Sequence, residues 1–112
     1  MSAVVDGVIR DLGEPYADGT PRLEIHVPMG QTDGLPIRMG ERVPVRLHIA
    51  GAEYQSGLRA TPANKYAWVC PDVLGSGGEA INLGRVLTAA GFQANDAVQL
   101  LADGESLTVR RA

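Results

Sequence analysis

The sequence predicts a mainly β protein: a small closed or nearly closed barrel of six to seven strands, with one short α-helix before a C-terminal hairpin. Two observations carry this prediction. Short segments in which apolar and polar residues alternate follow one another along the chain. Turn-forming residues separate them, since 14 glycines and 7 prolines occur among the 112 residues. Only one segment spaces its apolar residues as a helix does.

Two strands are first expected near the N-terminus, over residues 3–12 and 22–27. The second alternates clearly, with Leu23, Ile25 and Val27 on one face. A period of two places these three side chains toward a core.

The clearest strand is predicted over residues 42–50. Four apolar side chains alternate there with polar ones: Val43, Val45, Leu47 and Ile49. Pro44 lacks an amide donor, so this strand should lie at an edge, or be bulged, at that residue. The dipeptide Ala50-Gly51 then turns the chain into a second strand over residues 52–60.

A two-residue turn sets the register of this hairpin. The apolar faces of the two strands then coincide, which favours that pairing. The expected pairs are Leu47 with Tyr54, Val43 with Leu58, His48 with Glu53 and Arg42 with Arg59. The two arginines would face each other on the outside, which is unfavourable unless an anion lies between them.

A central strand is expected over residues 66–70, because both of its faces are apolar. The helix is predicted over residues 83–90 from the spacing of Leu83, Val86, Leu87 and Ala90. Asn82 is a suitable N-cap and Gly91 a suitable left-handed stop, with Phe92 folding back onto the last turn.

The C-terminal hairpin joins residues 96–102 to residues 106–111 across Asp103-Gly104, which suits a type I′ turn. The expected pairs are Val98 with Val109 and Leu100 with Leu107. The core should unite eight side chains: Val45, Leu47, Leu58, Trp68, Val98, Leu100, Leu107 and Val109.

The stretch from Leu83 to Val109 holds a short helix that ends at glycine, an aspartate before a strand and a closing hairpin. It resembles the swapped-hairpin barrels of the AbrB type and the DNA-binding pseudobarrels. From Arg42 to Val109 the chain is similar to a family of small bacterial barrels of unknown function, often fused to a bacteriocin-protection, OmpD-associated domain. The resemblance implies a barrel fold and carries no secure function.

Charge gives the main indication of function. The net charge is −3, which argues against a generally basic nucleic-acid binder. Residues 36–65 nevertheless carry five basic residues against two acidic ones, a local charge of +3. We therefore expect a non-enzymatic binding module that contacts nucleic-acid phosphates through a basic sheet face with a nearby aromatic ring. The candidate residues are Arg42, Arg46, Arg59, Lys65 and Tyr66.

The alternative site is the loop over residues 28–41. Loops of this length are uncommon and often functional. Its apolar side chains could cover the mouth of the barrel, or bind a protein partner or small ligand there: Met29, Leu35, Ile37 and Met39.

Other chemistry is weakly indicated. His26 and His48 lie on outer strand faces and Cys70 should be buried, so neither a metal site nor a catalytic thiol is expected. The glycine-rich loop over residues 75–78 lacks the Lys-Ser/Thr ending of a phosphate loop. The acidic residues near the N-terminus suit solvated turns better than an acid–base pair. No cofactor and no enzyme activity are expected.

Size and composition complete the expectations. The chain should form a single domain over residues 1–112, as a monomer or homodimer. No apolar run reaches the roughly 18 residues of a membrane span, and the N-terminus lacks the features of a secretory signal. A cytoplasmic protein without membrane contact is expected.

Overall fold

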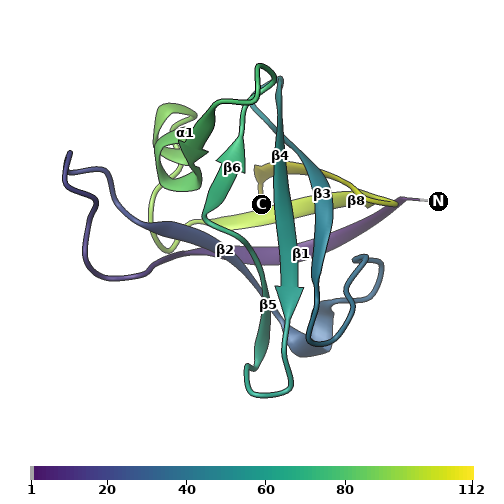
Figure 1. The fold of residues 1–112 in the computed structure, drawn as a ribbon. Coiled ribbons are helices and arrows are strands. Elements are labelled where there is room, and N and C mark those ends of the chain that lie inside the picture. The colour runs from purple at the N-terminus through teal and green to yellow at the C-terminus, as the bar shows by residue number, and fades with distance from the viewer. Residues whose placement is uncertain (1) are drawn as a thin grey trace.

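The computed structural model describes residues 2–112, which form one sheet of nine strands and one short α-helix. The chain also has a 3-10 turn, η1 (Met29–Gln31). The strands are β1 (Ser2–Asp11), β2 (Leu23–Pro28), β3 (Arg42–Ile49), β4 (Ala52–Ala60), β5 (Tyr66–Val69), β6 (Asp72–Leu74), β7 (Ala80–Asn82), β8 (Ala97–Asp103) and β9 (Ser106–Arg111). The helix, α1 (Leu83–Ala89), lies between β7 and β8 (Figure 1).

Seven strands close into a barrel. Their order is β3-β9-β8-β1-β2-β5-β4, and β4 pairs back onto β3. The β3–β9 pair is parallel, and the other pairs within the barrel are antiparallel. The predicted mainly β barrel with one short helix before a C-terminal hairpin is therefore confirmed.

The β3–β4 hairpin has the predicted register. Leu47 lies opposite Tyr54, and Arg42 lies opposite Arg59. Both central turn residues have positive φ, 51° at Ala50 and 82° at the glycine that follows it, as a type I′ turn requires. The four predicted pairs are confirmed.

Pro44 lies in a part of β3 that pairs on one side only. β9 pairs with β3 from Arg46 to Ile49, while β4 pairs along all of it. A missing amide donor is tolerated where the ladder is open, which agrees with the prediction of an edge position.

The C-terminal hairpin differs from the prediction in its register. Leu100 pairs with Val109, and Leu107 pairs with Ala102. The turn residues are Gly104 and Glu105, and only the glycine has positive φ (59°). Glycine at the first central position suits a type II′ turn, so the turn starts one residue later than expected. The pairing shifts by two residues, and the inward faces stay the same.

The barrel interior is filled by aliphatic side chains from every barrel strand. Seven of the eight predicted core residues are buried, and Trp68 is the exception. In β5 the inward positions belong to Ala67 and Val69, so Trp68 points outward and is half-buried. Both faces of this strand are apolar, and composition alone therefore could not tell which one faces the core.

The helix ends as predicted. Gly91 follows the C-cap with φ 88°, and its amide bonds the Thr88 carbonyl. Phe92 donates to the Leu87 carbonyl at 2.9 Å and is buried. These two hydrogen bonds form a Schellman motif.

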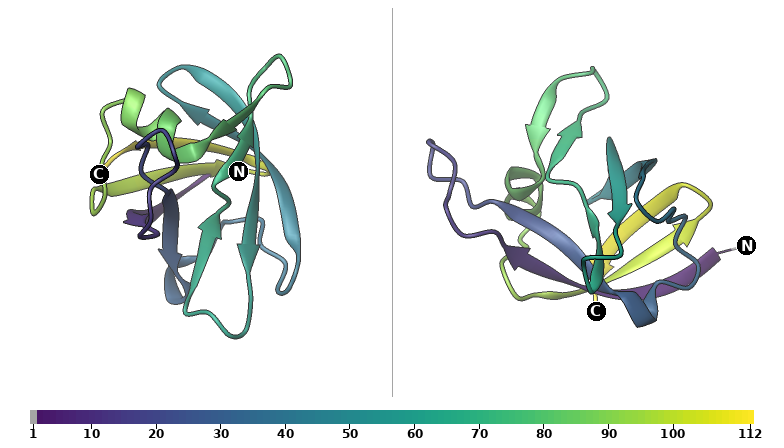
Figure 2. Two further views of the ribbon diagram at one scale, coloured as in Figure 1. Left: turned by 60° about the vertical axis from the view of Figure 1, so that its left-hand side comes forward. Right: turned by 60° about the horizontal axis from the view of Figure 1, so that its bottom comes forward.

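Beyond the barrel, a short hairpin of β6 and β7 branches from β4, where Gln55 pairs with Leu74. It projects from the barrel on the side where α1 lies (Figure 2, right). The expected glycine-rich connection is the turn of this hairpin, with Gly78 at φ 82°. The sequence analysis missed both strands because each is only three residues long.

The loop over residues 28–41 packs partly inward. Leu35 is buried in the core, Ile37 packs against it, and Met39 is 51% exposed. Burial of Leu35 and Ile37 leaves a smaller apolar surface for a partner than the composition of the loop suggests. Among the described residues, no helix is long and apolar enough to cross a membrane.

Candidate nucleic-acid interface

Three of the predicted basic side chains lie on the outer face of the β3–β4 hairpin. Arg42 and Arg46 alternate with the buried residues of β3, and Arg59 lies across from Arg42 on β4. Lys65 is exposed in the loop between β4 and β5. We call Arg42, Arg46 and Arg59 the arginine face.

The arginine face has no acidic partner within the described chain. Within residues 2–112, ion pairs join His26 to Glu24, His48 to Glu53 and Arg111 to Asp96. None involves Arg42, Arg46 or Arg59, although the first and last of these lie directly opposite each other. Like charges in that position repel, so a bound anion would relieve the repulsion.

The guanidinium of Arg42 lies flat against the sheet above Gly57. A Cβ atom at residue 57 would overlap Nε and Cζ of Arg42, so the glycine makes room for this conformation. Cys70 is buried beside it, and burial raises the pKa of the Cys70 thiol while the positive charge of Arg42 opposes the rise. Arg42 thus packs over Gly57 while remaining exposed to solvent.

Aromatic side chains continue the arginine face across the sheet. In the strand register Arg42 lies opposite Arg59, Arg59 opposite Trp68, and Trp68 opposite His26. These four residues form one outer row over β3, β4, β5 and β2. The place of Trp68 in this row differs from the predicted core position, and its alternation with Ala67 and Val69 is the signal in the sequence that indicates it.

The rings of Tyr66, His26 and Trp68 contact one another on this outer face, and we call these three residues the aromatic cluster. The Tyr66 ring stacks on His26 with centroids 4.0 Å apart, and Trp68 meets it edge-on at 5.8 Å. His26 Nε2 in turn lies 2.8 Å from Oε1 of the buried Glu24. One face of Tyr66 is therefore already covered by a ring, and the tyrosine is half-buried.

A groove of about 700 Å³ opens beside the arginine face. It lies between the β3–β4 hairpin and the β6–β7 hairpin, and its walls include Arg42, Arg46 and Arg85. Arg85 comes from α1 and is exposed. The sequence analysis did not select it, because nothing in the linear sequence brings residue 85 next to residues 42 and 46.

Metal chemistry has no evident site. Among residues 2–112, no three side chains of histidine, cysteine, aspartate or glutamate are grouped to hold an ion. The acidic residues near the N-terminus instead bond nearby backbone amides, Asp11 to Gly13 at 2.7 Å and Asp18 to Thr20 at 2.9 Å. These contacts suit turns.

Comparison of the chain with protein families, with curated proteins and with solved structures finds no match. The resemblance to swapped-hairpin and pseudobarrel domains thus stays a prediction. Any statement of function has to come from the geometry of the chain itself.

Proposed function

We propose that this barrel is a binding module for single-stranded nucleic acid, contacted by the arginine face, Lys65 and the aromatic cluster. The observation that carries the proposal is the outer row, in which two unpaired arginines, Arg42 and Arg59, are followed by Trp68. Cationic groups that track a phosphate backbone beside rings that stack on bases are typical of single-strand binding surfaces.

Electrostatics permits such binding although the chain is acidic overall. At physiological salt the Debye length is about 8 Å, so carboxylates on other faces of the barrel are largely screened at the contact. Guanidinium groups also suit phosphate, because they offer two parallel N–H donors. Because Arg42, Arg46 and Arg59 form no ion pair with the described residues, none has to be broken before they bind.

The aromatic part of the proposal assigns stacking to Trp68 and a supporting role to Tyr66. Trp68 is half-buried, while Tyr66 stacks on His26. A base that stacks beside Arg59 would lie against Trp68, the single tryptophan of the chain. Its fluorescence therefore reports on this contact alone.

The test is fluorescence anisotropy with labelled single-stranded and duplex oligonucleotides at low and physiological salt, with Trp68 emission recorded in parallel. We expect tighter binding to the single strand and quenching of Trp68. Four phosphate contacts would give a slope of log K against log salt near about −2.8 on single strands, or −3.6 on duplex DNA.

The decisive variant replaces Arg42, Arg46 and Arg59 together by serine. It should remove binding and leave the thermal melt unchanged. Its control replaces Arg10, Arg22 and Arg110 by serine, an identical charge change away from the arginine face, where these side chains contact Asn95, Tyr16 and Gln99. Equal weakening by both variants, or no binding by the wild type at about 50 mM salt, would contradict the proposal.

A further inference from the structure

The groove beside the arginine face combines three kinds of polar group. Three arginines are among the residues that line it, Arg42, Arg46 and Arg85. Two acidic residues line it as well, Asp72 and Glu105. Within the described chain none of these five groups is joined in an ion pair of 4 Å or less. A site with separate cations and anions suits a ligand that carries both an anionic group and hydrogen-bond donors.

The remaining walls suit the body of such a ligand. Asn82 precedes α1 at the N-cap position and lines the groove, and its side chain makes no capping hydrogen bond. Leu74, which is exposed, and the half-buried Ile81 supply apolar contact from the β6–β7 hairpin. The volume of about 700 Å³ lies within the range of small-molecule sites, about 300–1,000 Å³.

We propose that this groove binds one nucleotide unit, with its phosphate on Arg42, Arg46 and Arg85 and its nucleoside between the two hairpins. The proposal rests on the proposed function and deepens it, because a base can enter a groove only when it is not paired in a duplex. The unit could belong to a single strand or be a free mononucleotide, since the recognised chemistry is the same.

The carboxylates distinguish this ligand from a simple anion. Asp72 and Glu105 repel the charge of inorganic phosphate and of a nucleotide phosphate alike, and inorganic phosphate has only its own P–OH groups with which to offset that repulsion. A nucleoside has hydroxyl and amino groups that donate to carboxylate oxygens. The nucleotide is thus expected to bind more tightly than either of its parts.

The experiment titrates the full chain with adenosine 5′-monophosphate, adenosine and inorganic phosphate, followed by amide chemical shifts. We expect the mononucleotide to shift the amides of residues 72–74 and 80–82, and adenosine and phosphate to bind at least about tenfold more weakly. Phosphate that binds as tightly as the mononucleotide would overturn the inference. Mononucleotide shifts confined to other residues would overturn it too.

Two variants test the groove separately from the arginine face. Arg85→Ser removes one guanidinium and should weaken mononucleotide binding by roughly tenfold or more. Ala80→Trp changes no charge but places a large ring at an exposed position on the groove wall, so it should also weaken binding. Thr88→Trp, exposed elsewhere on the surface, is the matched control and should bind as the wild type does.

A third variant moves a guanidinium without removing it. Gly57→Ala should push the flexible side chain of Arg42 off the sheet, and the backbone at Gly57 does not have the positive φ that would strain alanine. We expect weaker mononucleotide binding with an intact fold, which the amide spectrum shows directly.

The two proposals fail differently. If Arg85→Ser and Ala80→Trp bind both a single-stranded hexanucleotide and the mononucleotide as the wild type does, the groove inference is wrong and the arginine face remains. If the mononucleotide binds in the groove but no oligonucleotide binds at all, the nucleic-acid function is wrong and the free nucleotide is the ligand. If the hexanucleotide shifts the groove amides and the mononucleotide does so only weakly, the groove binds a nucleotide that belongs to a single-stranded nucleic acid.

Discussion

The β3–β4 and β8–β9 hairpins lie side by side in the barrel and are alike on the inside. Their parallel β3–β9 pairing sets Leu47 beside Leu107 and Ile49 beside Val109, and all four are buried. Both hairpins also carry arginines outside. What those arginines contact is where the two hairpins differ.

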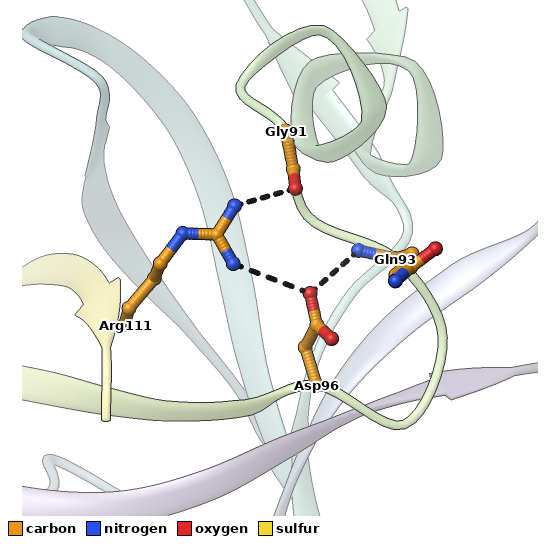
Figure 3. A network of polar contacts seen from close by, with 4 residues as sticks. All are labelled: Gly91, Gln93, Asp96 and Arg111. Carbon is orange, nitrogen blue, oxygen red and sulfur yellow. Dashed lines mark hydrogen bonds and ion pairs between the residues drawn. The ribbon is translucent and has the colours of Figure 1, made fainter.

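On the β8–β9 hairpin the outer arginines have local acceptors. The Arg111 guanidinium donates to the Gly91 carbonyl and pairs with Asp96 at 3.5 Å (Figure 3). It also lies over the Phe92 ring, 4.7 Å from the ring centroid. Arg110 donates to Gln99 Oε1 at 3.0 Å. These side chains connect β9 to the turn after α1 and to β8.

On the β3–β4 hairpin the arginine face forms no ion pair with a described carboxylate, and Arg42 instead lies beside the Cys70 thiol. An arginine with neighbouring carbonyl and carboxylate oxygens contributes to the fold. An arginine placed opposite another arginine contributes little to the fold and is available to an external anion. The same residue type thus serves stability on one hairpin and, we propose, binding on the other.

The largest expected effect tests the shared interior. Leu47→Ala and Leu107→Ala should each lower the free energy of unfolding by about 2–5 kcal/mol, because each removes a fully buried side chain from one core. Urea denaturation measures both losses. A loss near zero for either leucine would mean that the hairpins do not share a core, and the likeness of their interiors would then be wrong.

A smaller loss of unfolding free energy is expected when Asp96, the carboxylate that pairs with Arg111 of the β8–β9 hairpin, is removed. Asp96 accepts the Gln93 amide at 2.9 Å and pairs with Arg111 (Figure 3). Asp96→Ala should cost about 1–2 kcal/mol, mostly from the charge-assisted hydrogen bond to the amide. Glu41→Ala, at an exposed position before β3, is the control and should stay within about 0.5 kcal/mol of the wild type.

The smallest expected effect on stability compares one outer arginine from each hairpin directly. Arg111→Ser should lower the free energy of unfolding by about 0.5–1 kcal/mol, since its ion pair is partly exposed. Arg46→Ser should change it by less than about 0.5 kcal/mol. Thermal melts of the two variants under one buffer give the difference. A larger loss for Arg46→Ser than for Arg111→Ser would show that the arginine face is structural.

Much of the barrel could be predicted from local pattern. The register of the β3–β4 hairpin followed from alternation and a two-residue turn, because a slip of one residue would expose every apolar side chain. The C-terminal hairpin obeyed the same alternation, but a slip of two residues keeps the faces unchanged. Alternation therefore could not decide between Asp103-Gly104 and Gly104-Glu105 as the turn, and the turn conformation decided it.

The candidate site was predictable only in part. Arg42, Arg46 and Arg59 were found because one hairpin brings them to one face, and a hairpin is a local structure. Arg85 was not found, because it joins them through the packing of α1 and the β6–β7 hairpin. Trp68 was assigned to the core because its strand is apolar on both faces.

By itself the sequence determined the strand segments of the barrel, the helix and its glycine stop, the β3–β4 register and the basic centre of the chain. Each of these depends on residues close in the sequence, through side-chain period, turn conformation or local charge. Tertiary structure alone decided which face of β5 points inward, which arginines have acceptors and where the groove opens. Those features depend on the closure of the barrel, which brings β9 beside β3 and β5 beside β2 across long stretches of chain.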